Sequence, residues 1–403
     1  MKIQLHWQIL IAFVSGALYG LYLTEHIEYV GWMGDLFLRG LRMVIVPLIL
    51  SSIVSGIANI GDARNLGKLG LKTMAYYIFT SLFAIVTGLF LVNMIQPGVG
   101  AELGLSNKVE GLSAASDSFG NTLLNIVPTN IFSSLANGHI LSIILFSILF
   151  GFFITRLDDR PRTLLTELFQ SVFQVMMKIT MLIILFAPFG IFGIVANTVA
   201  QNIDSLAIVL GNMGRYMLVV ILGLSLHALV TLPLILKFAG RVNPMKHFGA
   251  VTTPLLTAFS TSSSSATLPL TMEAVHNGSG VSNKISSFTL PLGATINMDG
   301  TALYECVAAM FIAQAYGIHL GFPEQVIVVI TALLASIGAA GIPMAGLVMI
   351  TVILTTVGLP LEGVGLILAV DRILDMYRTM INVWSDTCGS VVIARSEGET
   401  LNV

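Results

Sequence analysis

Charged residues are scarce in this chain. Asp, Glu, Lys and Arg together make up 10% of its 403 residues, whereas a soluble domain carries about 25%. A chain with so few charges cannot cover itself with a water-facing surface, so we expect a polytopic membrane protein. The 19 basic and 21 acidic residues nearly balance, which gives no reason to expect nucleic acid as a partner.

Cysteine is almost absent as well. Only Cys306 and Cys388 are present, both in apolar surroundings. Two such thiols provide neither the regularly spaced set of a disulfide framework nor the paired spacing of a thiolate metal site. Neither kind of site is therefore indicated.

Long apolar runs dominate the sequence. Hydrophobic residues make up 55% of the chain, and its mean hydropathy is +0.90. Runs of about 20 apolar residues are typical of membrane-spanning helices, and we expect spans near 7–24, 36–60, 70–96, 121–155, 165–198 and 203–238. The N-terminal run is interpreted as the first span and not as a cleavable signal, because no small-residue cleavage site followed by a soluble domain appears.

The C-terminal part of the chain has a different pattern. Stretches 245–280 and 322–358 are apolar but broken by small residues and proline, whereas 284–316 and 361–395 predict long helices with polar residues inside. When loops are assigned to alternate sides, twelve basic residues fall on one face and only Lys108 on the other. Basic loops stay in the cytoplasm, so both termini are expected there. The same bias requires each broken stretch to enter and leave on one side, as a re-entrant hairpin.

The two expected hairpins carry similar segments, "SSSSATLP" (262–269) and "SIGAAGIP" (336–343). Each starts with Ser, ends with Pro and precedes an intramembrane acid, Asp299 or Asp375. This pattern predicts an inverted repeat of hairpin plus broken helix, and transporters bind substrate and ions where such repeats meet. Non-helical backbone at this depth survives only inside protein or beside a wet cavity. A plain surface loop is the alternative, disfavoured by the absence of charge.

A polar stripe lies in the last expected helix, "DRILDMYRTMINVWSD" (371–386). Its polar residues recur at helical spacing on one face: Asp371, Asp375, Arg378, Thr379, Asn382 and Asp386. A charge in a membrane helix costs at least about 2.5 kcal/mol, so the stripe must face an interior site. Asp beside Arg suits an amino dicarboxylate, because the carboxylate accepts from an ammonium and the guanidinium binds a carboxylate through two parallel hydrogen bonds. A purely structural Asp375–Arg378 ion pair is the alternative, which leaves Asn382 and Asp386 unexplained.

Two further polar clusters lie inside apolar helices. "TINMDGTALYE" (295–305) places Asn297 and Asp299 beside a glycine that can unwind the helix. With nearby carbonyl and hydroxyl oxygens they predict a cage of hard oxygen ligands, which alkali and alkaline-earth cations prefer. "YYIFTS" (76–81) is by itself more typical of ordinary helix–helix hydrogen bonding.

These motifs resemble the sodium-coupled glutamate/aspartate transporters, within the dicarboxylate/amino acid:cation symporters. The resemblance covers nearly the whole chain and is most specific in "TSSSSATLP", "NMDGTALYE", "ASIGAAGIPMAG" and "DRILDMYRTMINVWSD". It implies an all-α membrane protein with eight transmembrane helices and two re-entrant helical hairpins that works as an elevator-type transporter.

The resemblance also implies two layers within a single membrane unit, 1–403. A static scaffold, about 1–69 and 98–200, would hold a homotrimer together in the lipid bilayer. A mobile transport layer, about 70–97 and 201–403, would carry substrate across it, with the second hairpin as the external gate. The expected location is the plasma (cell inner) membrane, as a multi-pass protein.

The resemblance implies a substrate site for an acidic amino acid. Asp375 would hold the amino group, Arg378 the side-chain carboxylate, and the backbone at both hairpin tips would contribute. The implied set is Ser262, Ser264, Thr301, Ile342, Gly346, Asp375, Arg378, Thr379 and Asn382.

Co-transported sodium ions are implied in the same way. One would bind among Gly293, Asn297, Asn382 and Asp386. A second would use Thr295, Met298, Ser336, Ile337 and Ala339. A third would use Tyr77, Thr80, Ser81, Asn297 and Asp299.

The sequence departs from the family at one position. Relatives usually carry an extra arginine at the first hairpin tip or just after the substrate-binding aspartate, where this chain has Ser262 and Met376. Because that arginine's location goes with differences in cation counter-transport, coupling to potassium or protons stays open. Glu305 matches the acidic position that the family links to proton or potassium handling.

Sodium-driven uptake of L-aspartate and L-glutamate is the leading interpretation, and no enzymatic activity is expected. The nearest alternative is the same fold carrying neutral amino acids or plain dicarboxylates. A buried Arg378 without an anion disfavours the first, and Asp375 disfavours a substrate without an ammonium. An intramembrane protease is a remote alternative, because no His or Lys is spaced to activate the serines. A passive channel is less compatible with gated hairpins.

Overall fold

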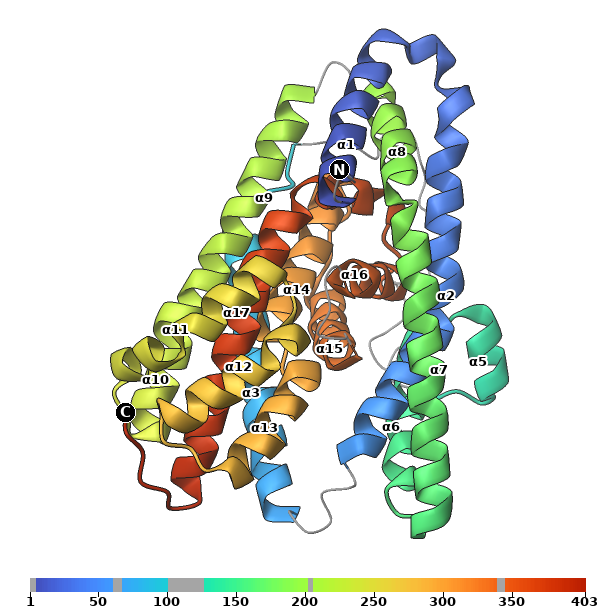
Figure 1. The fold of residues 1–403 in the computed structure, drawn as a ribbon. Coiled ribbons are helices and arrows are strands. Elements are labelled where there is room, and N and C mark those ends of the chain that lie inside the picture. Colours follow the sequence, from blue (N-terminus) through green and yellow to red (C-terminus); the bar gives the residue numbers. More distant parts are fainter. Residues whose placement is uncertain (1–4, 61–66, 101–126, 202–205, 339–344) are drawn as a thin grey trace.

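All regular structure in the described part of the chain is helical. The computed structural model describes residues 5–60, 67–100, 127–201, 206–338 and 345–403, and these contain no β-strand. Figure 1 shows the helices gathered into two groups with the shorter helices α15 and α16 between them. The all-helical prediction is confirmed for the residues described.

The N-terminal half consists of apolar helices. They are α1 (Leu5–Tyr22), η1 (Thr24–His26), α2 (Glu28–Ile60), α3 (Gly67–Ile95), α5 (Ile131–Asn137), α6 (Ile140–Ile154), α7 (Asp159–Leu185) and α8 (Ala187–Gln201). Within the described ranges, four helical stretches are long and apolar enough to cross a membrane: Glu28–Ala58, Leu69–Ile95, Asp159–Leu185 and Gly211–Gly240. The spans predicted at 7–24, 36–60 and 70–96 correspond to α1, α2 and α3.

Two predicted spans are interrupted. The span 165–198 is divided between α7 and α8, which meet at Phe186. Part of the span 121–155 lies outside the described residues, and the rest forms α5 and α6 instead of one helix. Gly138 ends α5 with a φ of 69°, a left-handed conformation that glycine adopts at little steric cost.

The sixth predicted span, 203–238, contains two wide turns. Helix α9 (Leu206–Leu226) continues into a π-helical turn, η5 (His227–Thr231), then α10 (Leu232–Ile235) and a second π turn, η6 (Leu236–Gly240). Pro233 lacks an amide proton and cannot donate to the carbonyl four residues earlier. A π turn accommodates such a break, and these turns are frequent at functional sites.

The first hairpin consists of α11 (Pro244–Thr261) and α12 (Ser264–Asn277). Asn243 begins α11 by accepting hydrogen bonds from two backbone amides with its side chain. The tip is tight: Ser262 adopts a φ of 52°, and the Ser263 side chain caps α12 by accepting from the Ala266 amide at 3.2 Å. The hairpin predicted for 245–280 is therefore present as two helices joined by a turn, while its re-entrant path stays a prediction.

The second hairpin consists of α15 (Phe322–Gly338) and α16 (Ala345–Thr356), and its tip lies outside the described residues. Between the hairpins the chain forms α13 (Asn283–Ile296) and α14 (Asp299–Ala315), so the predicted break is present. The long helix predicted for 361–395 is confirmed, whereas the break that the inverted repeat implied in it is absent. After η7 (Leu361–Gly363), helix α17 runs without a break over Val364–Ser396, and it has no proline and no glycine between Gly365 and Gly389 that would interrupt it.

Each of the two groups of helices is held together by its own internal contacts. In one, α2 packs on α6, α7 and α8, and α1 on α8; in the other, α14 and α17 pack against α3 and α9, and α11 packs on α17. Small residues allow the closest approaches, as is usual in membranes. A Cβ added at Gly20 of α1 would lie 2.5 Å from the Ala196 carbonyl oxygen of α8.

The residues after α17 fold back over the base of the first hairpin. Glu397 pairs with Lys72 of α3 at 2.5 Å. Glu399 accepts from both the amide and the hydroxyl of Ser282 at the start of α13, and the Asn402 amide donates to the Ser279 carbonyl at 3.0 Å. This C-terminal strap, residues 397–403, joins α3, α13 and α17.

Candidate functional site

The predicted site residues gather around α17, where it faces the break between α13 and α14. Asn382 of α17 holds this break open. Its side-chain oxygen accepts from the amides of Gly300 at 2.8 Å and Thr301 at 3.4 Å, and its amide donates to the Thr301 hydroxyl at 3.0 Å. Helix α14 therefore begins on a side chain of α17, which supplies the acceptor that its first amides need.

Gly300 is required by this arrangement. A Cβ at Gly300 would lie 2.6 Å from the carbonyl oxygen of Arg378. Any other residue would push α14 away from α17 and pull its first turn off Asn382. The glycine in "NMDGT" thus serves close helix approach, whereas the unwound residues are Asn297 and Met298.

Arg378 is the centre of the first cluster. Its guanidinium is 2% exposed and donates to Asp375 Oδ1 through Nε at 3.0 Å and Nη2 at 2.7 Å. Nη1 lies 3.6 Å from Asp371 Oδ1, and the guanidinium carbon stands 4.4 Å from the centre of the Tyr304 ring. The Tyr304 hydroxyl donates to Asp371 at 2.5 Å. Two carboxylates and an aromatic face therefore hold the arginine.

Both hairpins reach this cluster. A Cβ at Gly346, in the first turn of α16, would overlap the guanidinium of Arg378. Both α11 and α12 pack on α17, and at their tip Ser262 and Ser264 are buried, with the Ser262 hydroxyl making no hydrogen bond among the described residues. Thr379 donates to the Asp375 carbonyl at 2.7 Å. Ile342 lies outside the described residues.

The second cluster surrounds Asp299 and contains most of the third predicted sodium set. Ser81 donates to Asp299 Oδ1 at 2.6 Å. Thr80 lies 3.3 Å from Asp299 Oδ1 and 3.3 Å from Asn297 Oδ1. All four side chains are buried. Tyr77 is directed elsewhere, because its hydroxyl donates to the Thr289 carbonyl at 2.6 Å.

The first predicted sodium set also lies together. Asn297 donates to Asp386 Oδ1 at 2.9 Å, and a Cβ at Gly293 would lie 2.5 Å from that oxygen. Asn382 stands one helical turn before Asp386 on α17. Buried carboxylate, amide and carbonyl oxygens are ligands that suit a small hard cation.

The second predicted sodium set is less complete. Helices α13 and α15, which carry Thr295 and Ser336, are in contact. Met298 and Ser336 are buried and Ile337 is half-buried, while the Thr295 side chain is exposed. Ala339 lies outside the described residues.

Comparison with known proteins gives the family. The model of the sodium:dicarboxylate symporter family matches residues 5–396. The chain belongs to this family. It is 36% identical to a proton/glutamate-aspartate symporter of Escherichia coli (strain K12), over 98% of this chain and 93% of the relative. It is 38% identical to an excitatory amino acid transporter of Caenorhabditis elegans, over 94% and 85%, and 35% identical to a proton/sodium-glutamate symport protein of Geobacillus stearothermophilus, over 99% and 96%.

Membership in a symporter family makes this chain a multi-pass membrane transporter and not an enzyme. The protease alternative is therefore wrong.

Several residues at the site of this symporter were not assigned a role from the sequence. His227 and Ser385 contact Asp299, and Tyr304 contacts Arg378. A histidine inside the apolar run "SLHALV" and a serine one helical turn after Asn382 were the available signals. Glu305 is buried, and neither of its carboxyl oxygens has a hydrogen-bond partner among the described residues.

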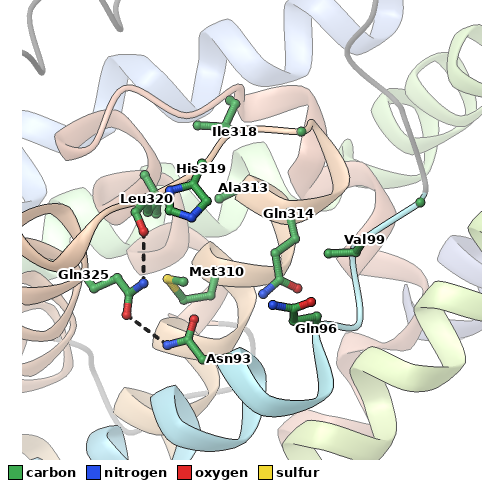
Figure 2. A pocket seen from close by; sticks show the side chains of 12 residues that line it. Asn93, Gln96, Val99, Met310, Ala313, Gln314, Ile318, His319, Leu320 and Gln325 are labelled. Atoms are coloured by element: carbon green, nitrogen blue, oxygen red, sulfur yellow. Dashed lines mark hydrogen bonds between the residues drawn. The ribbon is translucent and has the colours of Figure 1, made fainter.

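A polar pocket at the opposite end of α14 is not part of the site. Figure 2 shows this pocket of about 360 Å³ at the ends of α3 and α14. Asn93 donates to Gln325 at 2.9 Å, and Gln325 donates to the Leu320 carbonyl at 3.0 Å. Among the described residues its lining contains His319 but no Asp, Glu, Lys or Arg, so these residues do not form the Asp–Arg pair seen at Arg378. Its carboxamides fasten the start of the second hairpin to α3.

Proposed function

We propose that this symporter takes up L-aspartate and L-glutamate with sodium by an elevator mechanism. The observation that carries the proposal is the buried Asp375–Arg378 pair beside two buried acids, Asp299 and Asp386, in oxygen-rich surroundings. The printed names of the relatives, which pair glutamate or aspartate with protons or sodium, support it.

Substrate binding would exchange partners within the first cluster. The ammonium of an amino dicarboxylate would pair with Asp375, and its side-chain carboxylate with Arg378, so one internal ion pair becomes two. Tyr304 and Asp371 would keep the guanidinium in place during the exchange, because both already contact it. The backbone of Ser262 and of the second hairpin would bind the remaining carboxylate.

Sodium would neutralise the buried acids. Carboxylates at membrane depth are expensive unless a cation accompanies them, and the Asp299 and Asp386 side chains are buried. Asn382 would couple the two events, since it caps α14 beside the cation cluster and belongs to the predicted substrate set. We assign any proton coupling to Glu305, which is buried without a hydrogen-bond partner among the residues described.

We further propose the two-layer architecture and a homotrimer in the plasma (cell inner) membrane with cytoplasmic termini. The close packing of α1, α2, α6, α7 and α8 on one another supports a scaffold. Helix α7 supports the oligomer, because only 11% of its most apolar stretch is buried within one chain while Gln174 and Lys178 on it are exposed. Polar side chains at that depth favour protein neighbours over lipid.

The deciding experiment is uptake of labelled aspartate into proteoliposomes under imposed sodium, proton and potassium gradients. We expect accumulation that requires an inward sodium gradient and is blocked by excess glutamate but not by alanine or succinate. Succinate as the better competitor would favour the second candidate, a plain dicarboxylate carrier, which the family's name admits. Uptake that ignores sodium would refute the coupling.

A further inference from the structure

The two carboxylate oxygens of Asp299 have different partners. Oδ1 faces Ser81 and Thr80 of α3. Oδ2 accepts from Ser385 of α17 at 2.6 Å and lies 3.0 Å from Nε2 of His227 in η5. Asp299, Ser385 and His227 are all 0% exposed. Oδ1 of the carboxylate thus faces the predicted cation ligands, whereas Oδ2 faces two residues, Ser385 and His227, that are not in the predicted cation set.

The fold aims both of these groups at Oδ2. The π turn that begins at His227 is fixed to α17, because Trp384 donates its indole N–H to the Ala228 carbonyl at 3.1 Å. Ser385 directly follows Trp384, and its own carbonyl accepts from the Tyr76 hydroxyl at 3.3 Å. The donors to Oδ2 therefore lie on two helices that are joined to each other and to α3.

Ser385 orients Asn297 as well. Its hydroxyl donates its single proton to Asp299 and accepts from the Asn297 amide at 3.0 Å, while the second proton of that amide goes to Asp386. Both amide protons of Asn297 are then used, and its oxygen turns toward Thr80. A serine hydroxyl has one proton to donate, so Ser385 orients the ligands and is not itself turned toward the cation.

We propose that Ser385 and His227 are positioning residues for the cation site at Asp299. They hold Oδ2 so that Oδ1 and the oxygen of Asn297 converge on Thr80 and Ser81. A free carboxylate rotates readily about its terminal torsion, and here rotation would break two buried hydrogen bonds. When a cation binds, Ser81 and Thr80 rotate their protons away and present lone pairs. This inference rests on the proposed sodium coupling.

The test compares Ser385→Ala with Ser385→Thr, which keeps the hydroxyl. A matched control is Ser390→Ala on the same helix: Ser390 is equally buried and hydrogen-bonds Thr289 and the Asp386 carbonyl, but does not touch Asp299. We measure the sodium dependence of uptake at saturating aspartate and the aspartate dependence at saturating sodium. A third readout is the sodium-induced rise in melting temperature of the purified protein without aspartate.

Ser385→Ala is expected to raise the half-saturating sodium concentration about tenfold, the cost of one hydrogen bond to a charged group. Its KM for aspartate at saturating sodium should stay within about twofold, because no substrate contact is removed. Ser385→Thr and Ser390→Ala should keep the native sodium dependence. His227→Leu should raise the half-saturating sodium concentration as Ser385→Ala does. His227→Gln, which retains a hydrogen-bond donor, should raise it less.

The outcomes separate the two proposals. Sodium-dependent uptake with an unchanged sodium requirement in Ser385→Ala overturns the positioning role and leaves the proposed function standing. The positioning role is also overturned if Ser385→Ala raises the half-saturating sodium concentration and the KM for aspartate by the same factor. Equal effects of Ser385→Ala and Ser390→Ala on the sodium requirement overturn it as well. Sodium-independent uptake by the unmutated protein, without a sodium-induced shift in melting temperature, overturns both.

Discussion

Single buried residues of α17 decide which charges this symporter can accept. Arg378 is shared between Asp375 and Asp371 and rests on the Tyr304 ring. A buried guanidinium that lost its anions would be strongly destabilising, so the two acids make the arginine tolerable when no substrate anion is bound. Substrate choice at this position then depends on an exchange between internal and external carboxylates.

Replacing Arg378 should change the substrate class. In Arg378→Cys we expect aspartate affinity to fall at least about tenfold, since a charge-assisted contact contributes about 1.5–3 kcal/mol. Asp375 would still hold an ammonium, so serine, alanine or cysteine should become substrates. Competition assays in proteoliposomes measure both effects. Arg395→Cys, on the same helix but bonded to the Glu399 carbonyl at 3.1 Å, is the matched control. Near-native aspartate affinity in Arg378→Cys would show that the carboxylate binds elsewhere.

Neutralising Asp386 should weaken sodium binding more than it changes the choice of substrate. Asp386→Asn keeps the side-chain size but removes the charge that a cation would neutralise. We expect a large rise in the half-saturating sodium concentration and an unchanged order of preference among amino acid substrates. Sodium titrations of uptake, each run with aspartate, glutamate and alanine, check this prediction. A variant that changes its preferred substrate but not its sodium requirement would remove Asp386 from the cation site.

At the scale of elements, the second hairpin is held near the start of α15 and approaches the substrate cluster at the start of α16. Gln325 bonds the start of α15 to Asn93 of α3, while Gly346 of α16 lies so close to Arg378 that an added Cβ would overlap the guanidinium. If this hairpin is the gate that the resemblance implies, it would open about the α15 end. The absence of a side chain at Gly346 permits the close approach of α16 to the arginine.

A methyl group at Gly346 should prop the hairpin open. In Gly346→Ala the added Cβ would overlap the guanidinium, so the hairpin or Arg378 must move. We expect aspartate affinity to fall about tenfold or more, because a displacement of this size removes a charge-assisted contact. Gly249→Ala is the control, since a Cβ there meets nothing within 4 Å. Equal affinities in both variants would contradict the gate role.

The elements also differ in how well the sequence predicts them. Hairpin arms and the stripe on α17 follow from proline, small residues and helical spacing, so they were predictable. The break before Asp299 depends on a cap from Asn382, 83 positions later, and the local sequence suggested only that a glycine could unwind the helix. The partners of Asp299 could not be found locally, because His227 and Ser385 lie on helices that only the fold brings together.

At the scale of the whole molecule, the two groups of helices meet through the arms of the second hairpin and through α17, which contacts α1 and α8. Helices α15 and α16 contact α2 as well as α14. Movement of one group past the other would break these few contacts and leave each group's internal packing intact. The proposed elevator therefore keeps the packing of α14 and α17 on α3 and α9 and exchanges the contacts of α17 with α1 and α8.

Distances between spin labels can test this rigid division. We expect labels at the exposed positions Lys178 and Lys246, which lie in different groups, to give distance distributions that shift with sodium and aspartate. Labels at Lys246 and Lys284, in the same group, should keep one distance. The native Cys306 and Cys388 are buried, which limits background labelling. Ligand-dependent change within the Lys246–Lys284 pair would contradict a rigid transport group.

The C-terminal strap gives the two ends of the chain different mechanical roles. Val403 follows residues bonded to α3 and α13. A bulky protein fused after it would therefore move together with the helices that hold Arg378. One fused before α1 would instead be carried by α8 and its neighbours. A label on the C-terminal fusion should therefore change its distance from the scaffold during transport, whereas a label on an N-terminal fusion should not. The terminus that carries the tag therefore decides whether a fluorescence pair with a second label on the scaffold reports the movement of the transport group.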